Sequence, residues 1–345
     1  MDDIPTYSIP KKQKFYDFSI NAIGIDLGTS SCFAAVNRKN GIETVALDNT
    51  GERILPSYIG YEEAKVKCGK LVVERLGNYT KYTVFDSKRL IGQCYDEKLK
   101  DASWPFQIIN ENEFQRREPT TIVITIPAAF TESQKEATLT AAKLAGLDKV
   151  NLLPEPVAAS FAYFIDRPLS NNATILLFDL GGGTLDICIF KVNNSQMQII
   201  SNTGDPNIGG RDFDKVLYDF FKKELLTNFN VDLENQERRK LDVEDFDASK
   251  EGMIHLTRKD FEAKTNKLTE KLKKLIGKAL MEAKLQPHQI NKVFRVGGSS
   301  RMPIVQQMLM KMFPIADHCV EENPDEVVAR GAAYYSYHLA SEGHK

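Results

Sequence analysis

One short phrase occurs twice in this chain. Residues 25–30 read Ile-Asp-Leu-Gly-Thr-Ser, and residues 178–184 read Phe-Asp-Leu-Gly-Gly-Gly-Thr. Apolar runs flank both copies, as expected for two buried strands joined by a turn rich in Gly and Thr. The two aspartates, Asp26 and Asp179, are 153 residues apart, which is about one domain length. The repeat therefore predicts two similar lobes, each with its own hairpin.

Helical patterns alternate with predicted strands along the rest of the chain. We expect helices at residues 131–146, 210–229 and 257–285, and a last helix opened by Asn323, Pro324 and Glu326. Strands are predicted at residues 121–126, 173–178 and 292–296. This alternation is typical of an α/β protein. Residues 230–256 contain eight acidic and four basic residues without a clean period, and we expect a surface loop or linker there.

Composition and charge are those of an ordinary globular protein and bear on its partners and location. The 345 residues carry a formal net charge of −2, with 42% hydrophobic and 27% charged residues, as in ordinary soluble proteins. Charge therefore favours neither nucleic acid nor a membrane as a partner. The five cysteines are scattered, and the N-terminus has no apolar run of signal-peptide length. We expect reduced thiols and a cytoplasmic location.

The two Gly and Thr turns have the chemistry of a phosphate site. Glycines let consecutive backbone N–H groups approach an anion, and the hydroxyls of Thr29, Ser30 and Thr184 add donors. Asp26 and Asp179 could hold Mg²⁺ through water, because this ion prefers oxygen ligands and keeps part of its water shell. A single Gly-rich hairpin is usually only a hairpin, but two copies with matching acids favour phosphate binding.

Two further turns and two further acids fit the same site. Residues 296–303 contain Gly297, Gly298, Ser299 and Arg301 between a strand and a helix, a setting that suits a phosphate or nucleoside, or an ordinary connecting loop. Gly209 and Gly210 form a fourth candidate turn. Glu155, between two prolines, could orient a water or could complement a helix dipole. Asp186 could be a cation ligand or a partly exposed strand acid.

Seven phrases, in order, resemble the ATPase domain of the seventy-kilodalton heat-shock (DnaK-type) chaperones. They are GIDLGT at residues 24–29, VFDSKRLIG at 84–92, WPF at 104–106, FDLGGGT at 178–184, GGRDFD at 209–214, VGGSSR at 296–301 and NPDE at 323–326. The resemblance covers about residues 22–340. It implies the fold shared by actin and hexokinase, in which two lobes of ribonuclease-H-like topology enclose ATP in a cleft.

The resemblance also implies a role for each candidate residue. Asp26 and Asp179 would position Mg²⁺ and water, with Glu155, Asp186 and Thr184 as further catalytic or cation-binding groups. The remaining contacts to ATP or ADP would come from Gly28, Thr29, Ser30, Gly181, Gly182, Gly183, Gly209, Gly210, Gly297, Gly298, Ser299, Arg301 and Asp325. K⁺ is a further candidate ion.

The chain departs from the family pattern in three places. The family's lysine that reaches the γ-phosphate falls on Val73, and Lys70 or Arg75 could substitute only after a local shift. Loss of one preorganised charge costs about a hundred- to a thousandfold in turnover, so we expect slow hydrolysis. Only residues 107–119 connect two motifs that a strand and a long helix separate in the family, and the helix that clamps adenosine is not recognisable within residues 230–256.

The expected organisation is an N-terminal tail (1–21), a first lobe (22–167) and a second lobe (168–345), without a peptide-binding domain. The resemblance implies an ATP hydrolase that assists protein folding and refolding under stress, with J-domain co-chaperones and nucleotide exchange factors as partners and unfolded clients reached only indirectly. The alternative is a non-hydrolysing module that competes for co-chaperones. A sugar kinase or actin-like filament protein is a third reading, which the seven chaperone-type phrases oppose.

Overall fold

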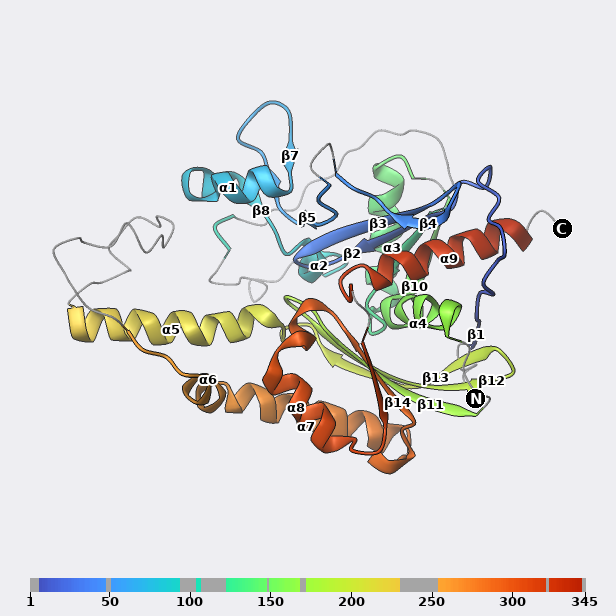
Figure 1. Ribbon diagram of the computed structural model, residues 1–345. Coiled ribbons are helices and arrows are strands. Elements are labelled where there is room, and N and C mark those ends of the chain that lie inside the picture. Colours follow the sequence, from blue (N-terminus) through green and yellow to red (C-terminus); the bar gives the residue numbers. More distant parts are fainter. Residues whose placement is uncertain are drawn as a thin grey trace.

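The computed structural model describes residues 6–47, 51–93, 104–106, 122–147, 149–167, 172–229, 254–320 and 323–342. Two sheets form the centre of this described part, and helices lie between and outside them (Figure 1). We call the sheet that contains the first Asp-Leu-Gly phrase the first sheet, and the other the second sheet. The predicted two-lobed α/β architecture is thereby confirmed.

Each copy of the phrase lies at the same topological position in its sheet. In the first sheet, strand β2 pairs antiparallel with β3 and parallel with β9, and β10 follows parallel to β9. In the second sheet, β11 pairs antiparallel with β12 and parallel with β14, and β15 follows parallel to β14. These strands are β2 (Ile23–Leu27), β3 (Ser31–Arg38), β9 (Ile122–Ile126), β10 (Val150–Pro154), β11 (Ala173–Leu180), β12 (Leu185–Asn193), β14 (Lys292–Val296) and β15 (Asp317–Val320). The sequence repeat is thus also a structural one.

Further strands complete the sheets. The first sheet adds β4 (Gly41–Thr44) and β5 (Leu55–Pro56), and the second adds β13 (Gln196–Asp205) and β1 (Thr6–Ser8). A small third sheet combines β6 (Ile59–Gly60), β7 (Lys67–Cys68) and β8 (Thr83–Val84), with helix α1 (Lys70–Tyr79) and the 3-10 helix η1 (Thr80–Tyr82) beside it.

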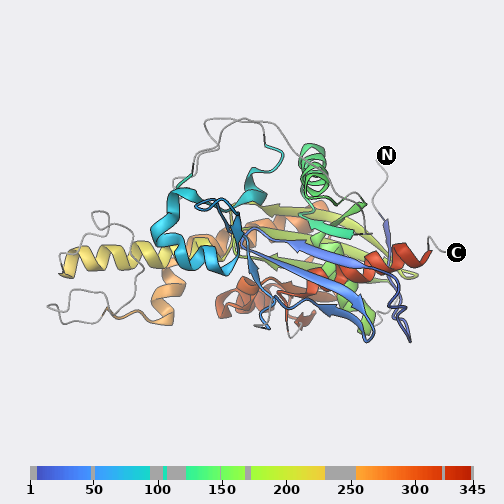
Figure 2. The same cartoon turned by 90° about the horizontal axis from the view of Figure 1, so that it is seen from above.

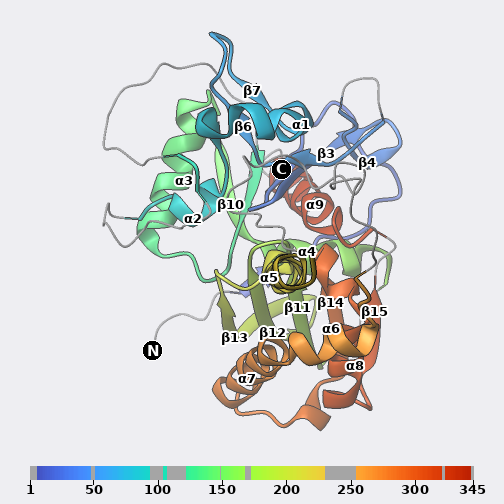
Figure 3. The ribbon, with the colours of Figure 1, turned by 90° about the vertical axis from the view of Figure 1, so that its left-hand side faces the viewer.

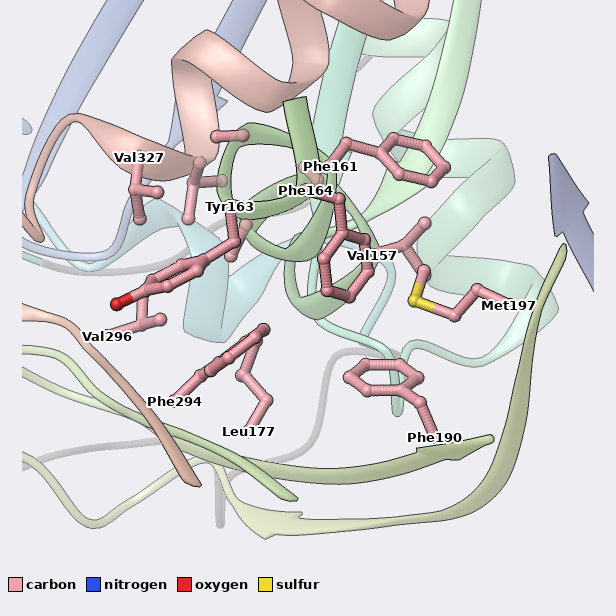
Figure 4. Packing of buried hydrophobic residues seen from close by; sticks show 14 of the residues in the cluster. Val157, Phe161, Tyr163, Phe164, Leu177, Phe190, Met197, Phe294, Val296 and Val327 are labelled. Atoms are coloured by element: carbon pink, nitrogen blue, oxygen red, sulfur yellow. The ribbon is translucent and has the colours of Figure 1, made fainter. Parts of the chain in front are cut away.

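Two helices fill the space between the main sheets. Helix α4 (Glu155–Asp166) packs on the second sheet, and α9 (Val327–Glu342) packs on both α4 and the first sheet. Figure 4 shows Val157, Phe161 and Phe164 of α4 above the second sheet, and the ring of Tyr163 stacks on Phe294 with centroids 4.1 Å apart. The α4 and α9 backbones approach so closely that a Cβ atom on Gly331 would overlap the carbonyl oxygen of Ala158.

Other helices cover the outer faces. Helices α7 (Asn266–Glu282) and α8 (Pro303–Met312) pack on the far side of the second sheet, where Leu272, Ile276 and Leu309 are fully buried (Figure 3). Helix α3 (Glu132–Leu144) packs on the first sheet. Helix α5 (Gly210–Phe229) begins beside the sheets and extends away from them (Figure 2). The remaining short helices are α2 (Ser87–Leu90), α6 (Arg258–Lys264), η4 (Pro287–Gln289) and η5 (Gly298–Arg301).

Both ends of the described chain contact the sheet of the opposite lobe. Near the N-terminus, β1 extends the second sheet by pairing with β13, and Tyr16 then packs on Tyr337 of α9 with ring centroids 5.0 Å apart. Near the C-terminus, α9 lies on the first sheet although it follows the second-lobe strands. The domain boundaries expected at residues 21 and 167 stay a prediction. The structure adds that β1 and α9 each pack on the sheet of the other lobe.

Most expected elements appear where the sequence places them, with two changes. Thr131 caps α3 in a capping box with Gln134, and α5 has its predicted bounds. The helix expected at 257–285 is instead two helices, α6 and α7, which meet at the buried Thr265. The last helix begins at Val327, directly after the 323–326 turn, and the Glu326 carboxylate accepts a hydrogen bond from Thr44 (2.8 Å) and pairs with Arg53.

Residues 107–119 and most of the predicted 230–256 loop lie outside the described residues. Within the described part, no helix combines the length and apolar character needed to cross a bilayer.

The α4–α9 contact can be tested with a pair of glycine substitutions. Gly331→Ala should lower the free energy of unfolding by about 1–3 kcal/mol, because the new methyl group overlaps the α4 backbone. Gly277→Ala in α7 meets no atom within 4 Å and should raise it by about 0.5–1 kcal/mol. Urea unfolding of both variants measures these changes. Equal stabilities for the two variants would contradict the close helix contact.

Candidate functional site

The two Gly and Thr turns, one from each lobe, touch each other. A Cβ atom on Gly182 would lie 2.5 Å from the Ser30 hydroxyl, and one on Gly183 would lie 3.1 Å from the Thr29 methyl group. The hydroxyl oxygens of Thr29 and Ser30 are buried, and neither has a hydrogen-bond partner among the described residues. Buried polar groups nearly always have a partner, so these two hydroxyls are available to a ligand at the first turn.

The fourth candidate turn supports the second hairpin. The N–H of Gly210 donates to the Gly181 carbonyl (3.0 Å), and the N–H of Arg211 donates to the Gly182 carbonyl (2.9 Å). A Cβ atom on Gly209 would overlap the backbone of Gly182 and Gly183, so this approach requires glycine. Thr184 closes the hairpin by accepting from the N–H of Gly181 (3.1 Å).

The third candidate turn contacts the same hairpin from the other side. Gly297 has a φ of 77°, and a Cβ atom there would lie 2.6 Å from Asp179 Oδ1. Gly298 approaches Asp325, whose carboxylate pairs with Arg301 at 3.3 Å, and Ser299 lies against Gly210. The structure therefore brings all four predicted turns and Asp325 together.

Four carboxylates surround the place where the lobes meet. Asp26 is the last residue but one of β2 and accepts a hydrogen bond from the Thr125 hydroxyl (3.2 Å). Asp179 and Asp186 are directly opposite each other on β11 and β12. Glu155 is the first residue of α4, and Glu155 and Asp186 are 7% and 4% exposed. The four acids predicted from sequence therefore lie near one another, although they come from three strands and a helix.

A buried lysine faces these acids. The ammonium of Lys88 in α2 forms an ion pair with Glu155, and the Lys88 side chain is 5% exposed. Sequence reasoning missed this residue, since a lysine in a short polar stretch is usually exposed. Its only signal was its place within the VFDSKRLIG phrase.

The segment that carries Lys88 connects the two lobes. Asp86, with a φ of 60° and 1% exposure, accepts hydrogen bonds from Trp104 Nε1 (3.1 Å) and from Arg211 Nη2 of α5 (2.5 Å). Arg89 Nη2 donates to the carbonyl of Gly183 (2.8 Å). These contacts fix α2 against the second hairpin.

Comparison with known proteins agrees with the duplicated hairpins and the acids between them. The model of the Hsp70 protein family matches residues 22–117 and 113–343. The chain belongs to the Hsp70 family. Its fold is the actin- and hexokinase-like ATPase fold that the sequence phrases implied.

Named chaperones are among the relatives of this Hsp70 chain. It is 33% identical over 380 residues to "Chaperone protein dnaK3" of Synechococcus elongatus, covering 93% of this chain and 50% of the relative. It is 33% identical over 381 residues to "Chaperone protein dnaK" of Thalassiosira pseudonana, covering 93% and 62%. The same-named protein of Cyanidium caldarium is 32% identical over 380 residues, covering 93% and 61%. The chain thus spans about half to three fifths of their lengths.

The structure shows where Val73 and its two possible substitutes, Lys70 and Arg75, lie in this Hsp70 chain. Val73 lies on α1 and is 38% exposed. Lys70 pairs with Glu52 at 2.6 Å, and Arg75 pairs with Glu63 at 2.9 Å, all on exposed side chains. Both cations are thus held in ion pairs with surface glutamates and not with the four carboxylates. The buried cation beside the carboxylates is Lys88 instead.

Burial raises the pKa values of three of the acids above their usual range. Desolvation, reinforced by the charge of Glu155, raises the pKa of Asp26 to about 7 and that of Asp186 to about 7, against the opposing charge of Lys88. Desolvation and the charges of Glu155 and Asp186 raise the pKa of Asp179 well above its usual range. Burial would lower the pKa of Lys88, but Glu155 and Asp26 raise it above its usual value. Lys88 therefore stays charged beside acids that titrate near neutral pH.

The acids make the stability of the ligand-free protein depend on pH. Asp26 and Asp186 have an ordinary pKa of 3.8 and a folded pKa of about 7, so between these values the folded state binds more protons than the unfolded state. The free energy of unfolding should therefore contain a component that falls as pH rises through this window. Asp186→Asn should weaken that fall, because the amide is neutral at every pH. Urea unfolding at a series of pH values measures the slope.

Asp260→Asn is the matched control. Asp260 is exposed, and its hydrogen bonds with Thr257 lower its pKa. Its contribution is present above the ordinary pKa and is lost as pH falls, so this variant should change the slope only at acid pH. Identical slopes for the wild type and Asp186→Asn between pH 4 and about 7 would contradict the prediction.

Proposed function

We propose that these residues form the MgATP-binding ATPase domain of an Hsp70-type chaperone, and that it hydrolyses ATP slowly. The observation that carries the proposal is the contact between the two hairpin turns, where the hydroxyls of Thr29 and Ser30 are buried without partners beside four carboxylates. Backbone N–H groups, free hydroxyls and nearby acids suit a polyphosphate with its counter-ion.

The described residues fit this ligand. Gly28, Thr29 and Ser30 on one side, and residues 181–184 on the other, would hold the phosphates. The turns at residues 209–210 and 297–301, with Asp325, would hold the nucleoside side. Among the described residues, no three His, Cys, Asp or Glu side chains are arranged to hold a metal ion directly. Asp26 and Asp179 would bind Mg²⁺ through water, because this ion keeps part of its water shell, and Mg²⁺ would supply charge neutralisation. K⁺ near Asp186 is a further candidate.

The acids suit hydrolysis of the terminal phosphate. An attacking water forms a bond to the γ-phosphorus, the bond to the bridging oxygen of ADP breaks, and the water releases a proton. Glu155 and Asp179 would orient the water, and Thr184 would donate to a phosphate oxygen. Asp186, with its pKa of about 7, can accept the proton and return it to solvent at neutral pH.

Two observations support slow turnover. Val73 replaces the expected lysine and lies on the surface. Lys88, the cation that faces the acids, shares its charge with Glu155. Charge stabilisation of the transition state should therefore be weaker than in a site with an uncommitted lysine.

The relatives named as chaperones support a place in protein folding and refolding under stress. The proposed partners are J-domain co-chaperones and nucleotide exchange factors. A cytosolic location is proposed because Cys32, Cys68, Cys188 and Cys319 are free thiols in the described part of the chain.

Calorimetric titration tests nucleotide binding. ATP should bind at one site with Mg²⁺ and more weakly without it, because Mg²⁺ reduces repulsion between the phosphates and the acids. A folded protein that binds no ATP under either condition would contradict the proposal. The alternative of a non-hydrolysing binding module would then stand, and Gly182→Asp, which places a side chain against Ser30, should still capture J-domain proteins.

Single-turnover hydrolysis tests the acids. Asp179→Asn should slow hydrolysis by about tenfold or more, because the amide cannot carry the negative charge that orients water and Mg²⁺. Asp219→Asn, a change of the same kind on an exposed position of α5, should leave the rate unchanged. An unaltered rate in Asp179→Asn would remove this residue from the mechanism.

A further inference from the structure

We infer that Lys88 binds the terminal phosphate of ATP and is the cation that this site uses in place of a lysine at position 73. The inference rests on the proposed function, since it requires ATP between the two hairpins. It assigns a substrate contact to a residue that the sequence did not single out.

The position of Lys88 is fixed on both sides. Asp86 immediately precedes α2 and is held by Trp104 and Arg211, and Arg89 follows Lys88 and is bonded to the Gly183 carbonyl. A lysine held between two anchored neighbours loses little further freedom when a ligand binds. The Lys88 side chain is thus preorganised toward the carboxylates.

The surroundings of Lys88 place it beside the first phosphate turn. The next residue, Arg89, donates to the Gly183 carbonyl, and a Cβ atom on Gly183 would lie 3.1 Å from the Thr29 methyl group. The first turn carries the unpartnered hydroxyls of Thr29 and Ser30. An anion that satisfies the hydroxyls would therefore lie close to the Lys88 ammonium.

Lys88 can bind a phosphate without releasing Glu155. An ammonium has three N–H donors, and Glu155 is the hydrogen-bond partner of Lys88 among the described residues. The remaining donors can reach an anion while the ion pair stays intact. Without such a cation, the acids would repel the terminal phosphate, since like charges in a poorly solvated site interact strongly.

Other cations near the site have other partners. Arg89 and Arg211 are bonded to the Gly183 carbonyl and the Asp86 carboxylate, and Arg301 pairs with Asp325. Lys70 and Arg75 form surface pairs with glutamates. Lys88, in contrast, is buried and pairs with Glu155, one of the four carboxylates of the site.

Affinities for ATP and ADP test the inference, because ADP lacks the terminal phosphate. Removing Lys88 alone would leave Glu155 as an unpaired buried charge, so the test variant is Lys88→Met combined with Glu155→Gln, and its reference is Glu155→Gln alone. Relative to that reference, calorimetry should show a loss of ATP affinity of about ten- to a hundredfold and little change for ADP. Lys70→Met is a surface control that should change neither.

Each outcome separates the inference from the proposed function. If the double variant binds ATP as tightly as Glu155→Gln does, the role of Lys88 is wrong while the ATP site stands. If the loss is equal for ATP and ADP, Lys88 does not contact the terminal phosphate, and the inference is also overturned. If the folded wild type binds neither nucleotide, the proposed function fails and the Lys88 role fails with it.

A measurement on the wild type covers the case in which the double variant does not fold. In protein labelled with ¹⁵N at lysine Nζ, the Lys88 resonance is assigned by comparison with Lys88→Arg. ATP should shift that resonance, and ADP should shift it much less, because only ATP brings an anion to the ammonium. Equal shifts with the two nucleotides would overturn the inference.

Discussion

The electrostatic balance around Lys88 is the constraint on which the rest of the site depends. Carboxylates from both lobes converge on a region packed among apolar strands, where an isolated charge is costly. The Lys88–Glu155 ion pair offsets part of that cost, and raised proton affinities of Asp26, Asp179 and Asp186 offset more. The acids can be buried together because Lys88 lies among them and because the pKa values of the other three carboxyl groups are raised.

The layer formed by α4 and α9 makes this convergence possible. Glu155 begins α4, and α4 packs on the second sheet while α9 bridges it to the first sheet. Gly331 allows the two helix backbones to touch, and the segment from Asp86 to Arg89 contacts Arg211 and the Gly183 carbonyl of the second lobe. The hairpins therefore meet because helices and a short loop hold two separately folded sheets in one arrangement. Any nucleotide bound there would contact both lobes, so its terminal phosphate is well placed to affect their relative position.

Short sequence patterns correctly predicted those elements that depend on residues close together in the chain. The two hairpins, the Thr131 capping box and the bounds of α5 depend on residues a few positions apart, and the structure contains all of them. Predictions failed where a distant partner decides. Glu326 precedes α9, and its carboxylate binds Thr44 and Arg53. Distant partners also fix Lys70 and Arg75, which pair with Glu52 and Glu63 on the surface.

The sequence by itself determined the duplicated hairpins, the α/β class, the membership of the Hsp70 family and the set of residues around the two turns. Those properties follow from short-range periodicity and from motifs whose order is specific. Only the tertiary structure decided that Lys88 is the buried cation, that Thr29 and Ser30 lack partners, and that both chain ends cross to the other lobe's sheet. Each of these depends on contacts between residues far apart in the chain, where burial and charge are set by the packing of whole layers.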